Sequence, residues 1–190
     1  FTKKLIDILP ILPRRRNHIF SGSNTWSEWK MMVSQLFAKN SLDEMSLINS
    51  YEKEFANKVN TEFAFSFGAG RMCLYAILDA LDIKEGDEVI IPAYTCVVVP
   101  NAILYRRATP IYIDIDPETL NIDVSLIEKS ISPRTKAILA QHTFGMPCDF
   151  SSIRNIADRH ELLVIEDCAH ALGAKYDGKP VGCLGDVAFF

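Results

Sequence analysis

The chain has 190 residues, of which 48% are hydrophobic and 23% charged, and its formal net charge is -4 at pH 7. This length can bury one sizeable hydrophobic core, while the negative charge argues against a protein that binds nucleic acid electrostatically. No apolar run approaches the roughly 20 residues that are needed to span a bilayer. The cysteines show no metal-ligand spacing, and their odd number argues against a disulfide framework, so we expect reduced thiols in a cytoplasmic protein. They are Cys73, Cys96, Cys148, Cys168 and Cys183.

The first 45 residues are predicted to form an N-terminal arm and a helix. Residues 5–12 are apolar but interrupted by Pro10, and basic residues flank them. We expect an arm that packs on the rest of the protein or on a second subunit, with a basic segment on a membrane surface as the alternative. Thr25 and Glu28 form a T-x-x-E capping pattern, which predicts the start of a helix. A second helix is expected over residues 47–59, where apolar residues recur at helical spacing.

From about residue 62, strands and helices are predicted to alternate. Apolar runs such as Leu162–Ile165 are typical of parallel strands that are covered on both faces, and Asp123 and Asp149 are placed as helix N-caps. The predicted fold class is therefore α/β, a three-layer, mostly parallel, doubly wound sheet. The expected strands are Glu62–Ser66, Glu88–Ile91, Pro110–Asp114, Ala137–Gln141, Leu162–Glu166 and Val187–Phe190, and the expected helices are Gly70–Leu81, Val97–Arg107, Val124–Ile131 and Phe150–Arg159.

The stretch from Leu162 to Gly173 carries the most informative side chains. Ligands of open α/β sheets bind at the carboxyl ends of the strands, where Glu166 and Asp167 stand. Because successive strand residues point to opposite faces, only one of these carboxylates can face a given ligand. Asp167, at the strand tip, could hold a protonated ring nitrogen by a charge-assisted hydrogen bond. Capping a helix or ending the strand is an equally weighted alternative for Asp167.

Three other loops follow predicted strands. Residues 66–71, SFGAGR, bring small residues to a helix start, which favours a phosphate group. A dinucleotide site is disfavoured because Cys73 occupies the third glycine position, and a tight turn without a ligand stays open. Residues 94–96, YTC, could lie against a flat ring or simply shape their loop. His142 could act as an acid or base, or be satisfied by neighbouring backbone. Residues 114–116, DID, indicate turn and cap chemistry, and no metal site is predicted.

Seven motifs occur in order and with natural spacing between about residues 51 and 190. They are FGAGR, GDEVIIPAYTCVVVPNAI, DIDPETLNID, SPRTKAI, HTFGMPCD, VIEDCAHALGAKYDGKPVG and GDVAFF. Together they closely resemble the DegT/StrS family of sugar aminotransferases, which depend on pyridoxal 5'-phosphate (PLP) and have the aspartate aminotransferase fold. The resemblance implies that residues 46–190 are the N-terminal part of a PLP-binding large domain, and that residues 1–45 precede it.

The resemblance also implies roles for five residues. Asp167 falls on the aspartate that pairs with the pyridine nitrogen of PLP and keeps the ring protonated. His170 falls beside the ring, near its 3-oxygen. Ala69 and Gly70 fall on the pair whose backbone N–H groups hold the phosphate, although relatives commonly have threonine where Ala69 stands. Cys96 falls where many relatives stack an aromatic ring on the cofactor, and a thiol cannot supply that area.

The lysine that forms a Schiff base with PLP in this family is expected just beyond Phe190, so the chain is expected to be part of a longer protein. The resemblance implies amino transfer, from glutamate, to a keto-sugar on a nucleotide carrier, by a cytoplasmic homodimer in polysaccharide or secondary-metabolite synthesis. A dehydratase of the same family, with histidine in place of the lysine, is one alternative. A non-catalytic regulatory or scaffold protein that keeps the fold is another.

Overall fold

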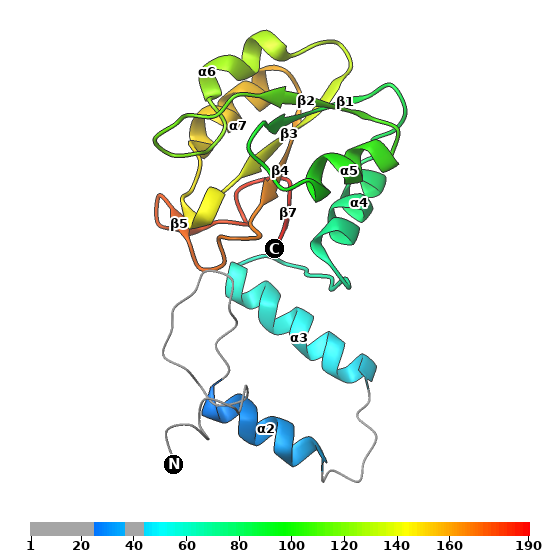
Figure 1. Ribbon diagram of the computed structural model, residues 1–190, viewed down its shortest axis with the longest axis vertical. Helices are drawn as coiled ribbons and strands as arrows, with labels where there is room; N and C mark the ends of the chain where they lie inside the picture. Colours follow the sequence, from blue (N-terminus) through cyan, green and yellow to red (C-terminus); the bar gives the residue numbers. More distant parts are fainter. Residues whose placement is uncertain (1–24, 37–43) are drawn as a thin grey trace, which may run out of the picture. The chain divides into compact units, whose positions relative to one another are not determined.

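The computed structural model describes residues 25–36 and 44–190 (Figure 1). The chain divides into two units, residues 1–47 and 48–190, and the predicted domain limits of 1–45 and 46–190 remain a prediction. The expected arm at residues 5–12 lies outside the described residues. In the first unit, helix α2, Trp26–Leu36, begins directly after Thr25, where the capping pattern predicts a helix start. The Thr25 carbonyl accepts the Trp29 N–H at 3.0 Å.

The second unit is built on a parallel five-stranded sheet with the strand order β2-β1-β3-β4-β7. Every neighbouring pair of these strands runs parallel, and the predicted α/β class is confirmed. Strand β1 is buried throughout and β3 and β4 are mostly buried, because helices cover both faces of the sheet. The strands are β1 Glu88–Pro92, β2 Thr109–Ile113, β3 Thr135–Gln141, β4 Leu163–Asp167 and β7 Val187–Phe189.

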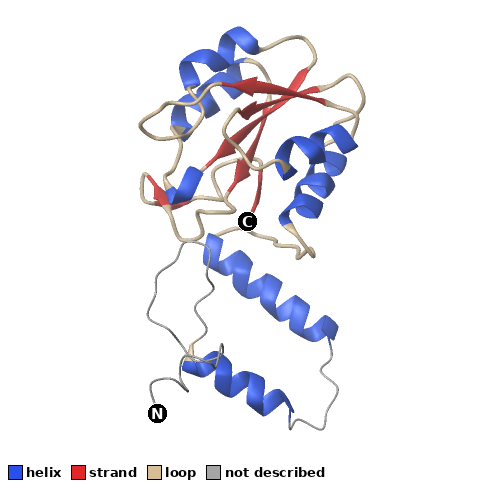
Figure 2. Cartoon of the chain, in the orientation of Figure 1, coloured by secondary structure: helices blue, strands red, loops and turns tan. Residues whose placement is uncertain are grey.

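Helices α4, Gly70–Ala80, and α5, Val98–Tyr105, pack on one face of this sheet (Figure 2). The opposite face is covered by α6, Val124–Ile127, and α7, Phe150–Arg159. Strand residues alternate between the two cores, as a period of two requires. Of the buried β4 residues, for example, Ile165 joins the α4–α5 core and Val164 joins the α6–α7 core.

Both predicted N-caps of this face are confirmed. The Asp123 side chain accepts the Ser125 N–H at the start of α6, and the Asp149 side chain accepts the Ser152 N–H at the start of α7. Helix α6 is shorter than predicted, because a 3-10 segment, Glu128–Ser130, continues it.

Three further elements complete the second unit. Helix α3, Glu44–Val59, begins in the first unit and continues into the second. A short hairpin joins β5, Lys175–Tyr176, to β6, Lys179–Pro180, and a 3-10 turn, η2, spans Thr143–Gly145. None of the helices that the structure describes is both long and apolar enough to cross a membrane.

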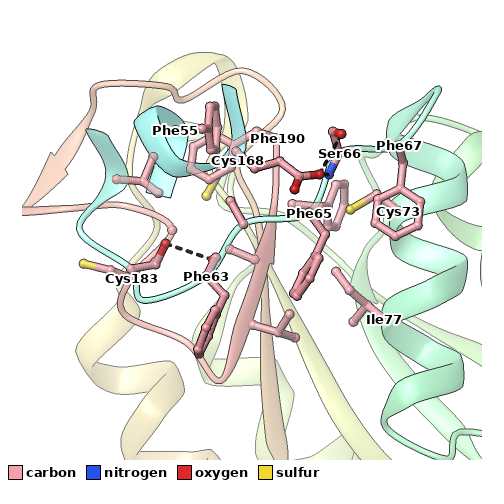
Figure 3. A pocket seen from close by; sticks show the side chains of 18 of the residues that line it. Phe55, Phe63, Phe65, Ser66, Phe67, Cys73, Ile77, Cys168, Cys183 and Phe190 are labelled. Atoms are coloured by element: carbon pink, nitrogen blue, oxygen red, sulfur yellow. Dashed lines mark hydrogen bonds between the residues drawn. The ribbon is translucent and has the colours of Figure 1, made fainter. Parts of the chain in front are cut away.

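The predicted strand Glu62–Ser66 is wrong. This segment has no regular secondary structure, and the Ser66 N–H and hydroxyl both donate to a Glu52 carboxylate oxygen of α3, at 2.6 and 2.8 Å. A strand needs a neighbour for its N–H and C=O groups, but no described strand lies beside this segment. Between it and β7 lies a groove of about 830 Å³ that both Phe65 and Phe189 line (Figure 3).

Candidate active site

The carboxyl ends of the central strands meet at one edge of the sheet. The Cα register aligns Gln141 of β3 with Asp167 of β4, and Asp167 in turn with Phe189 of β7. The backbone closes around this point, because the Asp167 carbonyl accepts the His142 N–H at 3.0 Å and the Phe189 carbonyl accepts the Cys168 N–H at 2.8 Å. Side chains that follow these strands are therefore brought together at this edge.

Asp167 is a nearly buried carboxylate whose side chain has one hydrogen-bond partner among the residues that the structure describes. The residue is 7% exposed, and its Oδ1 atom accepts the Ala169 N–H at 3.1 Å. Oδ2 accepts no hydrogen bond from any residue that the structure describes. Burial raises the pKa of Asp167, and the Ala169 hydrogen bond, the largest of the opposing effects, offsets only part of that rise. Asp167 therefore ends the strand in a tight turn and still offers one oxygen to a cationic ligand.

His170, exposed at this edge, packs against an aromatic residue that follows β3. The imidazole and the Phe144 ring are stacked, with centroids 5.4 Å apart and planes inclined by 5°. Phe144 also meets the Tyr94 ring edge-on, with centroids 6.3 Å apart. Three rings contributed by three different loops therefore form an aromatic row at this edge of the sheet.

The start of α4 offers unpaired backbone donors. The Ala69 carbonyl accepts the N–H groups of Met72 and Cys73, whereas the N–H groups of Gly70 and Arg71 have no acceptor among the described residues. These donors lie near the end of β7, because a Cβ atom placed on Gly70 would lie 3.9 Å from the Phe189 ring. An anion at this helix N-terminus would receive two N–H groups and the favourable end of the helix dipole.

The loop after β1 is held to the end of β3 by a side-chain amide. The Thr95 hydroxyl donates to Gln141 Oε1 at 2.6 Å, and Gln141 Nε2 donates to the Tyr94 carbonyl at 3.1 Å. Cys96 follows with an exposed, free thiol. The structure thus places all three residues of the YTC motif at the loop that follows β1.

Glu166, next to Asp167 in sequence, points into the opposite side of the sheet and is fully buried. Its two oxygens accept four donors: the N–H groups of Gly182, Leu184 and Gly185 at 2.8, 2.8 and 2.6 Å, and His142 Nε2 at 3.0 Å. Burial raises the pKa of Glu166, but these hydrogen bonds outweigh it, so the pKa lies below its ordinary value of 4.5. This ionised carboxylate joins the ends of β3 and β4 to the loop that leads into β7.

His142 is a structural histidine, the second of the two alternatives that its position in the sequence left open. It is 1% exposed, and its Nδ1 accepts the Cys148 N–H at 3.2 Å. Because Nδ1 is an acceptor, the ring proton sits on Nε2 and is donated to Glu166. The donor atoms of His142, Glu166 and Cys168 lie within 4.8 Å of one another. Because Nε2 carries this proton, it has no lone pair available for a metal ion.

We expect Glu166→Gln to lower the free energy of unfolding by about 2–6 kcal/mol, because a glutamine NH2 group cannot accept the two donors that face it. Each buried donor that loses its acceptor costs about 1–3 kcal/mol, and here two are affected. Since the pKa of Glu166 is lowered in the fold, its contribution is present above pH 4.5 and is lost as the pH falls.

Urea unfolding of the full-length protein between pH 3 and 7 measures this loss. Glu54→Gln, an exposed change on α3, serves as the control and should leave the unfolding midpoint in place. Equal midpoints for the wild type and Glu166→Gln at pH 7 would contradict the role assigned to Glu166.

A model described as the DegT/DnrJ/EryC1/StrS aminotransferase family matches residues 25–190. The chain belongs to this family. GDP-perosamine synthase of Escherichia coli O157:H7 is 46% identical over 143 residues, which cover 75% of this chain and 39% of that protein. The structure of an aminotransferase from Psychrobacter cryohalolentis superposes with a TM-score of 0.80 at 34% identity, over 94% of this chain and 44% of that one.

A second solved structure of interest is the E. coli GDP-4-keto-6-deoxy-D-mannose-3-dehydratase with bound hydrated PLP. It has a TM-score of 0.79 and 26% identity, and the match covers 90% of this chain and 45% of that one. The chain thus spans less than half the length of each of these three relatives. The resemblance of the seven sequence motifs to the DegT/DnrJ/EryC1/StrS family is confirmed.

Sequence reasoning about this DegT/DnrJ/EryC1/StrS chain missed two residues of the site. Glu166 had a signal, because a carboxylate in a strand buried on both faces must find buried donors. Phe144 had no such signal, because nothing in the sequence HTFG distinguishes it from any other exposed loop residue. Only the tertiary structure places it against His170. Of the predicted residues, Asp167 ends β4, His170 and Cys96 lie in the loops after β4 and β1, and Ala69 and Gly70 lie at the start of α4.

Proposed function

We propose that this chain is the cofactor-binding part of a PLP-dependent aminotransferase that acts on a nucleotide-linked keto-sugar. The observation that carries the proposal is Asp167, a nearly buried carboxylate at the carboxyl end of β4, one oxygen of which has no partner in the described part of the chain. A buried carboxylate whose pKa is raised lacks a cation, and a protonated ring nitrogen has the charge and the single N–H that would satisfy it.

The other residues at the edge fit the remaining groups of PLP. The N–H groups of Gly70 and Arg71 would hold its phosphate, with Ala69 supplying the turn before them. His170 would lie beside the ring oxygen. Cys96 would face the ring without stacking on it. When bound, PLP supplies an electron sink for the substrate carbon that loses its proton.

Each of these residues has a defined task in that proposal. Asp167 keeps the ring nitrogen protonated, which maintains the electron demand of the ring. Glu166 holds the strand ends in place, so that Asp167 and the start of α4 keep their spacing. His170 can donate or accept one hydrogen bond at the ring oxygen, and its exposure leaves the substrate side of the ring accessible.

The proposal is tested with the full-length protein, glutamate labelled with 15N at its amino group, and a panel of GDP-, UDP- and dTDP-linked keto-sugars. We expect PLP to be retained on gel filtration and 15N to appear in an aminated sugar nucleotide, read by mass spectrometry. These outcomes would support glutamate as the donor and a nucleotide-sugar as the acceptor. A protein that neither retains PLP nor changes any sugar would contradict the proposal and favour a non-catalytic scaffold.

A dehydratase is the second candidate, because a dehydratase with bound PLP shares this fold. The same incubation separates the two, since a dehydratase removes water from the sugar and leaves no 15N in it. We propose that the residue that decides between them, a lysine or a histidine, lies beyond Phe190. Retention of the pyridinium partner Asp167 disfavours the scaffold alternative, because a scaffold has no use for it.

We further propose that the full-length protein is a cytoplasmic homodimer in polysaccharide or secondary-metabolite synthesis, as the family resemblance implies. Sedimentation velocity should then give a dimer, with PLP absorbance sedimenting at the same rate. A monomer with full activity would refute the dimer and leave the cofactor assignment intact.

A further inference from the structure

The residue that stacks on His170 has a backbone conformation that bulky residues rarely adopt. Phe144 has φ 51° and ψ 28°, in the left-handed region, which side chains with a Cβ branch or ring generally avoid. Gly145 follows with φ 85°, and a Cβ placed there would lie 3.3 Å from the His170 carbonyl oxygen. The turn is therefore pressed against the His170 backbone as well as against its ring.

Four hydrogen bonds hold this turn in place. The buried Thr143 donates its N–H to Asn121 Oδ1 at 2.9 Å and its hydroxyl to the Leu120 carbonyl at 3.1 Å. Asn121, also buried, donates from Nδ2 to the Met146 carbonyl at 3.1 Å. Gln141 Nε2 donates to the Thr143 hydroxyl at 2.9 Å. A strained residue persists only where its surroundings determine it this strongly, and such residues cluster at functional sites.

The exposure of the Phe144 ring also argues against a purely structural role for it. Phe144 is 49% exposed, so it contributes little to the hydrophobic cores, and none of the three core clusters among the described residues contains it. Packing therefore does not explain why an aromatic ring is held in this conformation. Its ring contacts are the parallel stack on the His170 imidazole, at 5.4 Å and 5°, and the edge-on contact with Tyr94.

We propose that Phe144 is a positioning residue that holds the His170 imidazole in the orientation in which it meets the cofactor. This inference rests on the proposed function for the role of His170. Stacking on Phe144 restricts the rotation of the imidazole about its side-chain bonds, and the edge-on contact with Tyr94 keeps the Phe144 ring from turning away. The row of rings also supplies aromatic surface in a site where Cys96 supplies none.

Three substitutions distinguish the effect of the Phe144 ring from the effect of the left-handed backbone conformation at this position. Phe144→Tyr keeps the ring, Phe144→Leu keeps apolar bulk without a ring, and Phe144→Asn removes the ring but suits the left-handed conformation. The matched control is Tyr105→Leu, which removes an exposed ring at the end of α5. Thermal unfolding of all four variants shows whether each is folded.

The first readout needs no cofactor. The full-length apoprotein is labelled with 13C in histidine only, and the His170 signals are identified by their loss in His170→Gln. Imidazole protons that lie over a stacked aromatic ring are shifted upfield. We expect that shift in the wild type and in Phe144→Tyr, and its loss in Phe144→Leu and Phe144→Asn. Unchanged His170 signals in both ringless variants would overturn the inference.

The second readout is PLP affinity, measured by the change in cofactor absorbance. An aromatic pair is worth about two- to tenfold in a binding constant, so both ringless variants should bind PLP more weakly by that factor. Phe144→Tyr and Tyr105→Leu should match the wild type. Weaker binding in Phe144→Leu with wild-type binding in Phe144→Asn would assign the effect to the turn backbone and overturn the role of the ring.

The two hypotheses fail in different ways. If the wild type binds no PLP, the proposed function fails, while the histidine signals still decide whether Phe144 orients the imidazole. If PLP binds equally well to every Phe144 variant, the positioning role fails and the cofactor assignment stands.

Discussion

Asp167→Asn is expected to leave the apoprotein at least as stable as the wild type while it reduces transamination by about 100-fold or more. The asparagine keeps the shape of the side chain and can still accept the Ala169 N–H. It has no charge with which to hold a protonated ring nitrogen, and the loss of one charge-stabilising group in an active site typically costs about 10²–10³ in rate.

The stability half of this prediction follows from the direction of the pKa shift. Burial raises the pKa of Asp167 above its ordinary value of 3.8. A carboxyl group with a raised pKa contributes stability below its unfolded pKa and loses that contribution as the pH rises through its folded pKa. At neutral pH the burial of this carboxyl group therefore lowers the stability of the wild-type apoprotein, and the neutral asparagine avoids that cost. A bound cation removes the same penalty, so PLP should stabilise the wild type more than the variant.

Urea unfolding of the full-length apoprotein at pH 5 and pH 8, with and without PLP, measures both effects. Asp177→Asn is the matched control, because Asp177 is an exposed aspartate in the turn between β5 and β6 with φ 47°, which asparagine also tolerates. The control should behave as the wild type in every assay. Near-normal turnover in Asp167→Asn, or a marked loss of apoprotein stability, would contradict the role given to Asp167.

Residues 1–190 expressed alone are expected to be poorly soluble, to lack the absorbance of lysine-bound PLP and to have no transaminase activity. Strand β7 pairs with β4 on one side, and on its other side no described strand covers it. The groove beside it is lined by the rings of Phe63 and Phe65, which are 68% and 74% exposed. A free strand edge next to exposed aromatic rings is a template for aggregation (Figure 3).

The family resemblance implies what covers this groove in the full-length protein. An antiparallel strand from beyond Phe190 would pair with β7 on one side and with residues 62–66 on the other, which would also turn that segment into a strand. Without it, each buried N–H or C=O group that lacks a partner costs about 1–3 kcal/mol, against a total stability of about 5–15 kcal/mol.

Light scattering and gel filtration of residues 1–190 and of the full-length protein test this prediction. In the short form, Phe63→Lys with Phe65→Lys should restore part of the solubility, because the added charges disrupt edge pairing. Tyr105→Lys, at a ring on α5 that is 62% exposed, should not. A soluble short form that unfolds cooperatively and retains PLP would show that the groove needs no further strand.

The sequence alone was enough to derive the parallel sheet and its helices. Runs such as Leu162–Ile165 are apolar on both faces, and this pattern indicates a strand that is covered on both sides. Asp123 and Asp149 mark the starts of helices, because each side chain accepts a hydrogen bond from a backbone N–H group a few residues later. These patterns are local in the sequence, so they can be recognised without knowledge of the fold. The position of Asp167 at the tip of β4 follows from the same strand, although its role remains a proposal.

The tertiary structure decided the features that depend on distant partners. Residues 62–66 have the composition of a strand but not the conformation, because β-structure requires a neighbour and none is described beside them. His142 proved structural because Glu166, 24 residues away, and the Cys148 N–H occupy both ring nitrogens. Phe144 acquired its contact with His170 only when β3 and β4 were aligned. The fold as a whole determines which strands pair, and the residues of a single loop do not predict that pairing.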